Sequence, residues 1–335
     1  MSRPAFPFSA IVGQEEMKQA LIWTAIDPTI GGVLILGDRG TGKSTAIRAL
    51  AALLPEIEAV EGCPVNSPAL SDVPEWARGA GETLISLPTP VIDLPLGATE
   101  DRVVGALDIE AAMATGETRF QAGLLARANR GYLYIDEVNL LEDHIVDLLL
   151  DVAQTGENVV ERDGLSIRHP ARFILIGSGN PEEGELRPQL LDRFGLSVDI
   201  ASPTDIELRI EVVKRREAFE NDTTKFMRKW TKQDRALRDD ILSARAVLAK
   251  VKSPKSALRD CAALCLHLGS DGLRGELTLL RSARAEAAYR DDKTITRDHI
   301  KAAAPSALRH RLRRDPLDDT GAGARVARAV EDVLA

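Results

Sequence analysis

The sequence predicts an α/β protein with a parallel sheet between helices, followed by a smaller all-α domain. From about Ile11 to Pro203, short apolar runs alternate with helical segments, and the runs are apolar at consecutive positions. Such strands are typical of a parallel sheet, because helices cover both of its faces. After Pro203 the apolar residues follow a helical period. We therefore expect an α/β core over residues 1–203 and a helical domain over residues 204–335.

Five apolar runs are expected as strands of the sheet: Gly32–Gly37, Ile57–Val60, Tyr132–Ile135, Phe173–Gly177 and Leu196–Ile200. Helices are expected at Ser44–Leu54, which ends before Pro55, and at His144–Gln154. An Asp-Gly pair lies between Asn158–Arg162 and Leu165–Arg168. This pair favours a tight turn, so the two segments are expected to form a β-hairpin.

The second domain is expected to hold five main helices: Asp205–Phe219, Asp234–Val251, Lys255–Leu268, Gly275–Arg290 and Arg297–Arg313. Thr204 and Glu207 have the spacing of a capping box, which predicts that Thr204 caps the first of them. A short amphipathic segment, Arg325–Leu334, follows near the end.

Composition and charge limit the class of protein. The 335 residues carry 43 Lys+Arg against 51 Asp+Glu, a net charge of −8, which argues against a dedicated nucleic-acid binder. No apolar run approaches the ~18 residues that a membrane span needs. The N-terminus lacks the pattern of a signal or transit peptide. We therefore expect a cytoplasmic protein without a membrane span.

The three cysteines are too few for a disulfide framework. Cys261 and Cys265 lie on one face of a predicted helix, whereas Cys63 is isolated. A metal site with His267 would lack a fourth ligand. Buried, inert thiols are the expected alternative, although redox sensitivity of the pair stays open.

The strongest motif is Gly37–Ser44, GDRGTGKS, which fits the P-loop pattern between a predicted strand and a predicted helix. Its glycines allow backbone N–H groups to turn toward phosphate oxygens, and the helix N-terminus adds its positive dipole. Lys43 is expected to reach the β- and γ-phosphates, and the Ser44 hydroxyl is expected to bind Mg²⁺. The alternative is a glycine-rich connection between strand and helix that binds no ligand. Such a connection would not need a Lys followed by a Ser, so the P-loop interpretation is favoured.

An acidic pair follows the predicted strand Tyr132–Ile135. Asp136 is expected to hold Mg²⁺, directly or through water, and Glu137 is expected to polarise the attacking water. Ligands of open α/β sheets bind at the carboxyl ends of the strands. A solvated pair of carboxylates is the plain alternative, and the P-loop makes it the weaker one.

Three further polar residues are candidates for hydrolysis. Asn180 follows a predicted central strand and can hydrogen-bond the water or the γ-phosphate, although Asn-Pro is also a common turn. Arg193 can act on the nucleotide of a neighbouring subunit, joined by Arg187, or it can form a surface pair with Asp192. Arg274 begins a helix, where a cation is poorly placed for the dipole, so a role at the nucleotide is favoured.

Together these residues resemble the AAA+ ATPases, and more closely the ATPase subunit I of magnesium chelatase. Seven stretches across nearly the whole chain carry this resemblance: Phe8–Glu15, Gly37–Ser44, Asp93–Glu110, Gly123–Asp136, Glu157–Arg172, Gly177–Phe194 and Asp271–Arg281. The P-loop is shared with many families, whereas the stretch from Glu157 to Phe194 is far more specific. Because the N-terminus lacks the pattern of a transit peptide, we expect a bacterial form of the subunit rather than a plant one.

The resemblance implies roles for individual residues. Asp136 and Glu137 would be Walker B, Asn180 sensor 1, Arg193 the arginine finger and Arg274 sensor 2. The residues near ATP would be Val12, Gly13, Gly37, Asp38, Arg39, Gly40, Thr41, Gly42, Lys43, Ser44 and Thr45. It also implies ATP and Mg²⁺ as cofactors. Inserts in the ATPase core are expected near residues 83–118 and 158–168.

The resemblance further implies a ring of subunits, expected to be a hexamer, stacked on the chelatase D subunit. ATP hydrolysis would drive an H subunit that carries protoporphyrin IX and inserts Mg²⁺, in chlorophyll or bacteriochlorophyll synthesis. Aromatic residues make up only 4% of the chain, and no cluster of His, Cys or aromatic residues suggests a porphyrin pocket. We therefore expect the chelation chemistry to lie on another subunit.

Three alternatives share parts of this pattern. A MoxR-type ring chaperone for metalloenzyme maturation would carry the same ATPase motifs. A nucleic-acid motor would find support in the basic run from Arg309 to Arg314, for which a solvated or ring-contact helix face is the preferred interpretation. A scaffold with a degenerate nucleotide site is disfavoured by the intact Lys43, Asp136 and Glu137.

Overall fold

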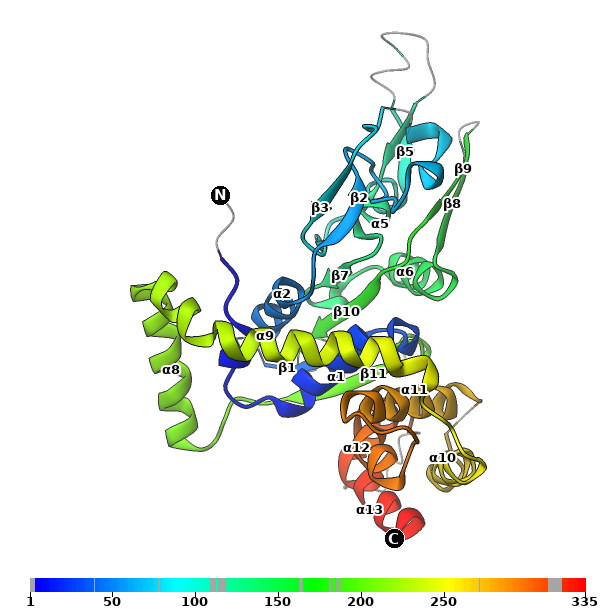
Figure 1. Ribbon diagram of the computed structural model, residues 1–335. Coiled ribbons are helices and arrows are strands. Elements are labelled where there is room, and N and C mark those ends of the chain that lie inside the picture. Colours follow the sequence, from blue (N-terminus) through cyan, green and yellow to red (C-terminus); the bar gives the residue numbers. More distant parts are fainter. Residues whose placement is uncertain are drawn as a thin grey trace. The chain divides into compact units, whose positions relative to one another are not determined.

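The chain divides into two compact units, one of residues 1–53 with 179–335 and one of residues 54–178 (Figure 1). The structure is a computed structural model. It describes residues 4–38, 40–77, 79–108, 113, 119–162, 165–180, 182, 184, 186, 188–270, 272–312 and 321–335. The predicted boundary near residue 203 separates an α/β part from a helical part, whereas the two units are defined by their internal contacts. The predicted boundary therefore stays a prediction.

The first unit contains a parallel strand pair covered by helices. Strand β1 (Val33–Gly37) pairs with β11 (Leu196–Ile200), with Val33 opposite Leu196 and Gly37 opposite Ile200. The helix α1 (Glu15–Ile26) contacts both strands, and α2 (Lys43–Leu53) packs against α1. Most residues of the two strands are apolar and buried, which explains why their positions were predicted correctly.

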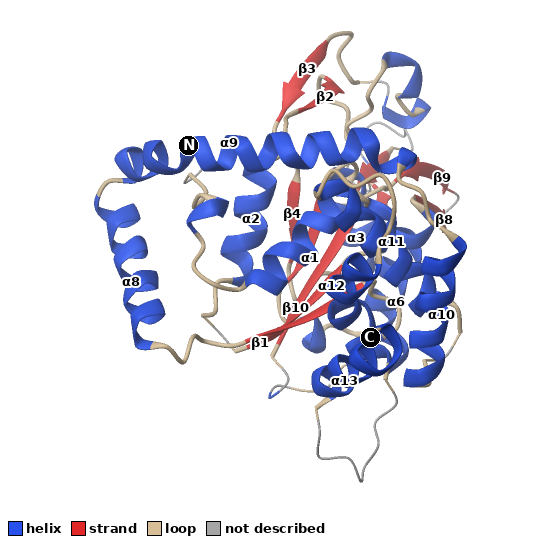
Figure 2. Ribbon diagram, turned by 60° about the horizontal axis from the view of Figure 1, so that its bottom comes forward, coloured by secondary structure: helices blue, strands red, loops and turns tan. Residues whose placement is uncertain are grey.

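Two long helices, α8 (Ile206–Asn221) and α9 (Thr223–Val247), follow β11 and meet at Asp222 (Figure 2). The predicted start of the second helix at Asp234 was wrong, because Asp222 caps α9 eleven residues earlier by accepting a hydrogen bond from the Lys225 N–H at 2.9 Å. The capping box expected at Thr204 is also absent. Asp205 caps α8 instead, accepting from the N–H of Leu208 at 2.9 Å.

An aromatic cluster holds the α8–α9 corner to the N-terminal segment. The rings of Phe6, Phe219 and Phe226 lie 5.1 to 5.7 Å apart between centroids. Trp230 extends the cluster along α9, and the Arg215 guanidinium lies 4.7 Å from the centre of the Trp230 ring. These contacts bury apolar surface at the corner and add a cation–π interaction.

The C-terminal part of the first unit is helical, as predicted. Its helices are α10 (Lys255–Leu268), α11 (Arg274–Tyr289), α12 (Arg297–Leu308) and α13 (Ala322–Leu334). Helices α11 and α12 pack closely, with small buried side chains such as Ala283, Ala287 and Ala304. Trp23 of α1 donates to the buried Glu286 carboxylate of α11 at 2.8 Å, so α1 is tied to these helices.

The second unit has three parallel strands: β4 (Val91–Leu94), β7 (Tyr132–Ile135) and β10 (Ile174–Gly179), with β7 between the other two. The last residue of β10, Gly179, already belongs to the first unit. The expectation that Ile57–Val60 is a central strand was wrong. That segment forms β2, which pairs antiparallel with β3 (Leu84–Leu87). The sequence pattern missed β4, because Asp93 interrupts its apolar run.

Among its described residues, the second unit also contains two further antiparallel pairs and several helices. The predicted hairpin is present as β8 (Glu157–Arg162) and β9 (Leu165–Pro170), while its Asp-Gly turn lies outside the described residues. The other pair is β5 (Gly105–Leu107) with β6 (Phe120–Ala122). The helices of this unit are α3 (Glu100–Val104), α5 (Leu124–Ala128) and α6 (Asp143–Thr155).

The described residues also contain one-turn helices: η1 (Phe8–Ala10), η2 (Pro28–Ile30), η3 (Leu70–Asp72), η4 (Glu75–Ala77), η5 (Val138–Leu140), α7 (Pro188–Leu191), η7 (Leu248–Lys250) and η8 (Arg309–Arg311). Parallel strands flanked by helices, followed by a helical C-terminal part, agree with the predicted fold class. Within the described residues, no helix has the length and apolar character to cross a membrane.

Candidate nucleotide site

The predicted phosphate-binding loop connects β1 to α2 in the first unit, as a P-loop requires. Gly37, Gly40 and Gly42 have φ values of +149°, +80° and +88°, which glycine adopts more readily than other residues. A Cβ at Gly37 would lie 2.1 Å from the carbonyl oxygen of Ile200, so only glycine fits against β11. Arg39 lies outside the described residues.

The amino group of Lys43 points back into this loop. It donates to the carbonyl oxygen of Gly37 and, at 3.4 Å, to that of Gly179 at the end of β10. Ser44 and Thr45 follow in the first turn of α2 and are partly buried. The loop is braced by a hydrogen bond of 2.9 Å from the Thr41 hydroxyl to the Asp38 carbonyl oxygen. A cation and a helix N-terminus therefore meet at the end of β1, where a phosphate group would be stabilised.

The predicted acidic pair lies in the second unit, directly after the fully buried β7. The Asp136 side chain is exposed, and its Oδ1 accepts hydrogen bonds from the hydroxyls of Tyr134 at 2.8 Å and Ser178 at 2.5 Å. Glu137 has a φ of +55°, which is uncommon for a residue with a side chain. Such backbone outliers cluster at functional sites, so the conformation of Glu137 supports a functional role for this residue.

Asn180 follows β10 and is buried, with 8% of its surface exposed. Its side-chain oxygen accepts the N–H of Glu182 at 3.1 Å, so part of its hydrogen-bonding capacity serves a local turn. This is the turn that the Asn-Pro sequence suggested. The side-chain amide nitrogen keeps its donors for another acceptor, so the turn and the predicted role are compatible.

Of the two predicted arginines, Arg274 pairs with Asp192, the residue directly before Arg193. Arg193 follows α7, and Arg274 starts α11. The Nη1 of Arg274 donates to Asp192 Oδ2 at 3.1 Å, and the other carboxylate oxygen of Asp192 accepts from Arg311. The structure therefore connects Arg274 to the residue directly before Arg193. Arg187, which was expected to join Arg193, lies outside the described residues.

The basic run that begins at Arg309 does not form the solvated or ring-contact face that we expected. Arg309 is bound by Glu16 and, at 3.0 Å, by Asp199, and its side chain is 10% exposed. His310 Nε2 bonds the Phe194 carbonyl oxygen at 3.1 Å, and the Arg311 side chain is 3% exposed. These groups serve contacts within the chain, which removes their support for a nucleic-acid motor. Arg313 and Arg314 lie outside the described residues.

Val12 and Gly13 occupy the connection from η1 to α1, and both are partly buried. Gly13 and the next residue, Gln14, both have positive φ values, of 66° and 58°. The Gln14 side chain donates to the Ala201 carbonyl oxygen at 3.0 Å, just after β11. This hydrogen bond connects the turn to the residue that follows β11. The position of Val12 and Gly13 near the adenine stays a prediction.

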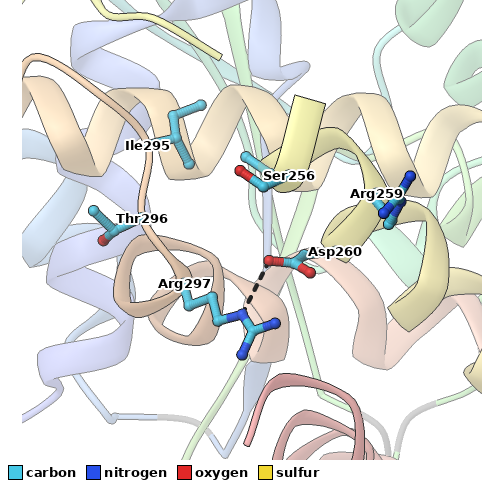
Figure 3. Close-up of a pocket in the computed structure, with 7 residues that line it drawn as sticks. Ser256, Arg259, Asp260, Ile295, Thr296 and Arg297 are labelled. Carbon is cyan, nitrogen blue, oxygen red and sulfur yellow. Dashed lines mark hydrogen bonds and ion pairs between the residues drawn. The ribbon is translucent and has the colours of Figure 1, made fainter. Parts of the chain in front are cut away.

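A cavity of about 270 Å³ lies elsewhere, between the starts of α10 and α12 (Figure 3). Arg297 reaches across it to the Asp260 carboxylate at 3.2 Å, as the dashed line in the figure shows. None of the predicted site residues lines this cavity, and its Arg297 is already paired with Asp260. We therefore do not assign the nucleotide to it.

The two helical cysteines are buried, as expected. Cys261 and Cys265 lie on α10 and are 2% and 0% exposed. Burial, reinforced by nearby carboxylates, raises the pKa of each thiol to about 12. Thiolates, which are the reactive form, are therefore scarce at neutral pH. Among the described residues, no group of three or more His, Cys, Asp or Glu side chains could hold a metal ion.

The residues present fit a nucleotide with Mg²⁺ better than a metal held by protein ligands alone. Mg²⁺ commonly binds one or two carboxylates together with phosphate oxygens and water. Asp136 offers an exposed carboxylate whose Oδ2 accepts no hydrogen bond from the described residues. Ser44 offers a hydroxyl in the first turn of α2. Both are oxygen ligands, which Mg²⁺ prefers.

Two family models match parts of the chain. A family model for the AAA lid domain matches residues 258–332, and one for magnesium chelatase subunit ChlI matches residues 107–189. The magnesium-chelatase 38 kDa subunit of Cereibacter sphaeroides is 69% identical over 334 residues, which cover 100% of both chains. The chain belongs to the magnesium-chelatase subunit I family. It is therefore an AAA+ protein and an ATPase component of magnesium chelatase, as the resemblance implied.

Other relatives extend this similarity. The magnesium-chelatase 38 kDa subunit of Rhodobacter capsulatus is 69% identical over 333 residues, which cover 99% of this chain and 95% of that protein. The ChlI subunit of Guillardia theta is 51% identical over 340 residues, 99% of this chain and 96% of that protein. The relationship therefore spans the chelatase subunits of bacteria and of an alga.

Two solved structures are similar along most of the chain. One is a cryo-EM-based structure of the complex between the BchI and BchD subunits of magnesium chelatase. It is 66% identical, covers 99% of this chain and 100% of that chain, and has a TM-score of 0.59. The other is a putative ATPase from Cytophaga hutchinsonii with a TM-score of 0.67, 97% and 92% coverage and 17% identity. At this identity the second match shows the fold alone.

Proposed function

We propose that the chain binds and hydrolyses ATP and that this hydrolysis drives insertion of Mg²⁺ into protoporphyrin IX, in chlorophyll or bacteriochlorophyll biosynthesis. The observation that carries this proposal is the 69% identity over the full chain to a magnesium-chelatase 38 kDa subunit. That relationship favours a chelatase over a MoxR-type chaperone, which would share the ATPase motifs alone. The cytoplasmic location predicted from the sequence stays a prediction.

In this proposal the loop from Gly37 to Ser44 binds the phosphates. Backbone N–H groups of the loop and the amino group of Lys43 stabilise the negative charge that spreads over the transferred phosphoryl group. Ser44 and Asp136 would hold the Mg²⁺ ion, which neutralises phosphate charge when bound. Val12 and Gly13 would lie near the adenine, and Thr45 would complete the loop.

Three side chains would act on the water and the γ-phosphate. Glu137 accepts a hydrogen bond from the attacking water and orients it, while the Asn180 amide donates to the water or to the γ-phosphate. Arg274 would contact the γ-phosphate within the same subunit. Arg193 would reach the nucleotide of the neighbouring subunit, where a guanidinium stabilises the developing charge.

The proposed assembly is a ring of this subunit, a hexamer, that binds the chelatase D subunit. The solved complex between BchI and BchD supports the D subunit as a partner, because its BchI-like chain covers 99% of this sequence. An H subunit would carry the porphyrin, and the inserted Mg²⁺ is a substrate there. The domain division near residue 203 and the inserts near residues 83–118 and 158–168 remain part of this proposal.

ATP turnover by the purified chain tests the nucleotide part of the proposal. We expect Mg²⁺-dependent phosphate release that is lost in Lys43→Ala, because the substitution removes the cation facing the phosphates. Lys232→Ala is the control, because Lys232 is exposed on α9 and distant in sequence from the loop. Equal turnover in Lys43→Ala and wild type would overturn the assignment of the loop.

A further inference from the structure

Three oxygen atoms form a compact triangle at the end of β7. Asp136 Oδ1 lies 2.8 Å from the Tyr134 hydroxyl and 2.5 Å from the Ser178 hydroxyl, and the two hydroxyl oxygens lie 2.9 Å apart. The Tyr134 and Ser178 side chains come from neighbouring strands, whereas Asp136 is the first residue after β7. All three belong to the second unit.

The strand register creates this triangle. Residues two apart on a strand point to the same side, which places Tyr134 beside Asp136. Strands β7 and β10 are parallel, with Tyr134 opposite Ile176 and Ile135 opposite Gly177. The next pair in this register is Asp136 with Ser178. A shift of one residue would move the serine to the other face of the sheet.

Burial makes the two hydroxyls a rigid support. Tyr134 is 3% exposed and Ser178 is fully buried at 0%, whereas Asp136 is exposed. Buried hydroxyls need hydrogen-bond partners, and an ionised carboxylate can accept from both of them. The two buried hydroxyls therefore hold the exposed carboxylate in place through its Oδ1. Its Oδ2 receives no hydrogen bond from the described residues.

We propose that Tyr134 and Ser178 are positioning residues for the magnesium carboxylate. They hold Asp136 Oδ1, so that Oδ2 is presented to Mg²⁺ or to a water bound to it. This inference rests on the proposed function, because it assumes that Asp136 serves the metal. Groups that orient a metal-binding carboxylate typically contribute about 10–100-fold to metal affinity or activity.

Ser178 also touches the second acidic residue. The backbone N–H of Glu137 points to the Ser178 hydroxyl at 3.4 Å. Glu137 has the left-handed backbone conformation noted above, with a φ of +55°, which surrounding contacts must maintain. Ser178 therefore supports the carboxylate of Asp136 and the backbone of Glu137 together. The Tyr134 hydroxyl contacts the Asp136 carboxylate and the Ser178 hydroxyl, so variants of Tyr134 and Ser178 remove different sets of contacts.

The test measures binding of a fluorescent ATP analogue as Mg²⁺ is titrated, with a parallel measurement in EDTA. We expect Tyr134→Phe and Ser178→Ala each to raise the Mg²⁺ concentration at half-maximal effect by about 3–10-fold, and the double variant by about 10–100-fold. Affinity in EDTA should stay within about twofold of wild type, because the P-loop is untouched. A loss of fold would lower both affinities together.

Two matched controls remove a tyrosine and a serine hydroxyl at other positions. Tyr132 lies on the same strand and the same side as Tyr134 and is 1% exposed. Ser197 is a buried strand serine on β11 whose hydroxyl has no hydrogen-bond partner among the described residues. Tyr132→Phe and Ser197→Ala should leave the Mg²⁺ midpoint at its wild-type value.

The outcomes separate this inference from the proposed function. If wild type responds to Mg²⁺ but the double variant has the same midpoint, the positioning role is overturned and the function stands. If Mg²⁺ changes nothing in wild type, the assignment of Asp136 to the metal is overturned, and the positioning role falls with it. A shift in Tyr132→Phe equal to that in Tyr134→Phe would also contradict the positioning role.

Discussion

Arg311 donates to both the main chain and the side chain of Asp192. Its Nη1 bonds the Asp192 carbonyl oxygen at 2.7 Å and also Oδ1, while Nη2 bonds the Phe194 carbonyl oxygen at 2.8 Å. These acceptors flank Arg193, the proposed arginine finger. The helical part of the chain therefore fixes the backbone on both sides of the residue that would act on a neighbouring subunit.

Removal of Arg311 should destabilise the protein. Its side chain is 3% exposed, and Arg311→Ala would remove the donor of the Asp192 carbonyl oxygen and of Asp192 Oδ1, so we expect the free energy of unfolding to fall by about 2–4 kcal/mol. Urea unfolding followed by circular dichroism measures this change. Arg297→Ala is the control. Arg297 is 53% exposed in its pair with Asp260, so its loss should cost below about 1 kcal/mol. Equal losses would contradict the bracing role.

Glu137→Gln should bind ATP and fail to turn it over, since the amide cannot accept a proton from water. We expect turnover to fall by about 10²–10⁴-fold while the affinity for the fluorescent ATP analogue is retained. Glu142→Gln, which changes another glutamate after β7 whose side chain is 81% exposed, should behave as wild type. Near-normal turnover in Glu137→Gln would contradict the role of this carboxylate.

Arg193→Ala should bind ATP and lose hydrolysis at the neighbouring site. An arginine finger contributes about 10³–10⁵-fold to turnover, so the pure variant should be nearly inactive. Mixed with wild type, it should lower activity by more than its share, because each variant subunit impairs a neighbour. Arg216→Ala, half-exposed in an α8 ion pair, is the control for the mixing experiment. Activity strictly proportional to the wild-type fraction would exclude action between subunits.

Stability should fall below about pH 6.5 through His310. Burial and the Arg311 charge lower the pKa of His310 from 6.5 to about 3, although the hydrogen bond to Phe194 opposes them and the Arg309 charge adds to the lowering. The unfolded chain therefore binds the proton first, and the free energy of unfolding decreases as the pH falls from about 6.5 toward 3. Between pH 6.5 and 5 the loss should reach up to about 2 kcal/mol.

His310→Gln should remove this part of the pH dependence, because glutamine stays neutral. His267→Gln serves as the matched change, since His267 has 48% of its side chain exposed. Urea unfolding at several pH values between 5 and 8 compares the two variants with wild type. The same slope in His310→Gln and wild type would show that His310 does not set it.

The sequence predicted elements best where apolar residues alone define them. Strands β1, β7 and β11 lie within a residue of the expected bounds, because almost every position is buried. Strand β4 was missed because Asp93 and flanking prolines hide it. The start of α9 depends on one capping residue, Asp222. Aspartate is common both at helix starts and in turns, so the sequence alone did not show which role it has here.

For the candidate site too, the sequence predicted what local motifs define and missed what depends on residues far apart in the chain. Local motifs predicted the loop at Lys43 and the pair after β7, because each lies on a few consecutive residues. Support of Asp136 by Ser178 depends on the register of two strands about forty residues apart, which no local pattern contains. The basic run was misread because the partners of Arg309, Glu16 and Asp199, lie far away in sequence.

The most direct test of the central claim is Mg²⁺ insertion into protoporphyrin, followed by fluorescence, with D and H partner subunits present and this chain added or omitted. We predict that product forms only when this chain and ATP are both present, and that Lys43→Ala cannot replace wild type. Product formation at the same rate without this chain, while the chain still hydrolyses ATP, would contradict the account and leave an ATPase with another client.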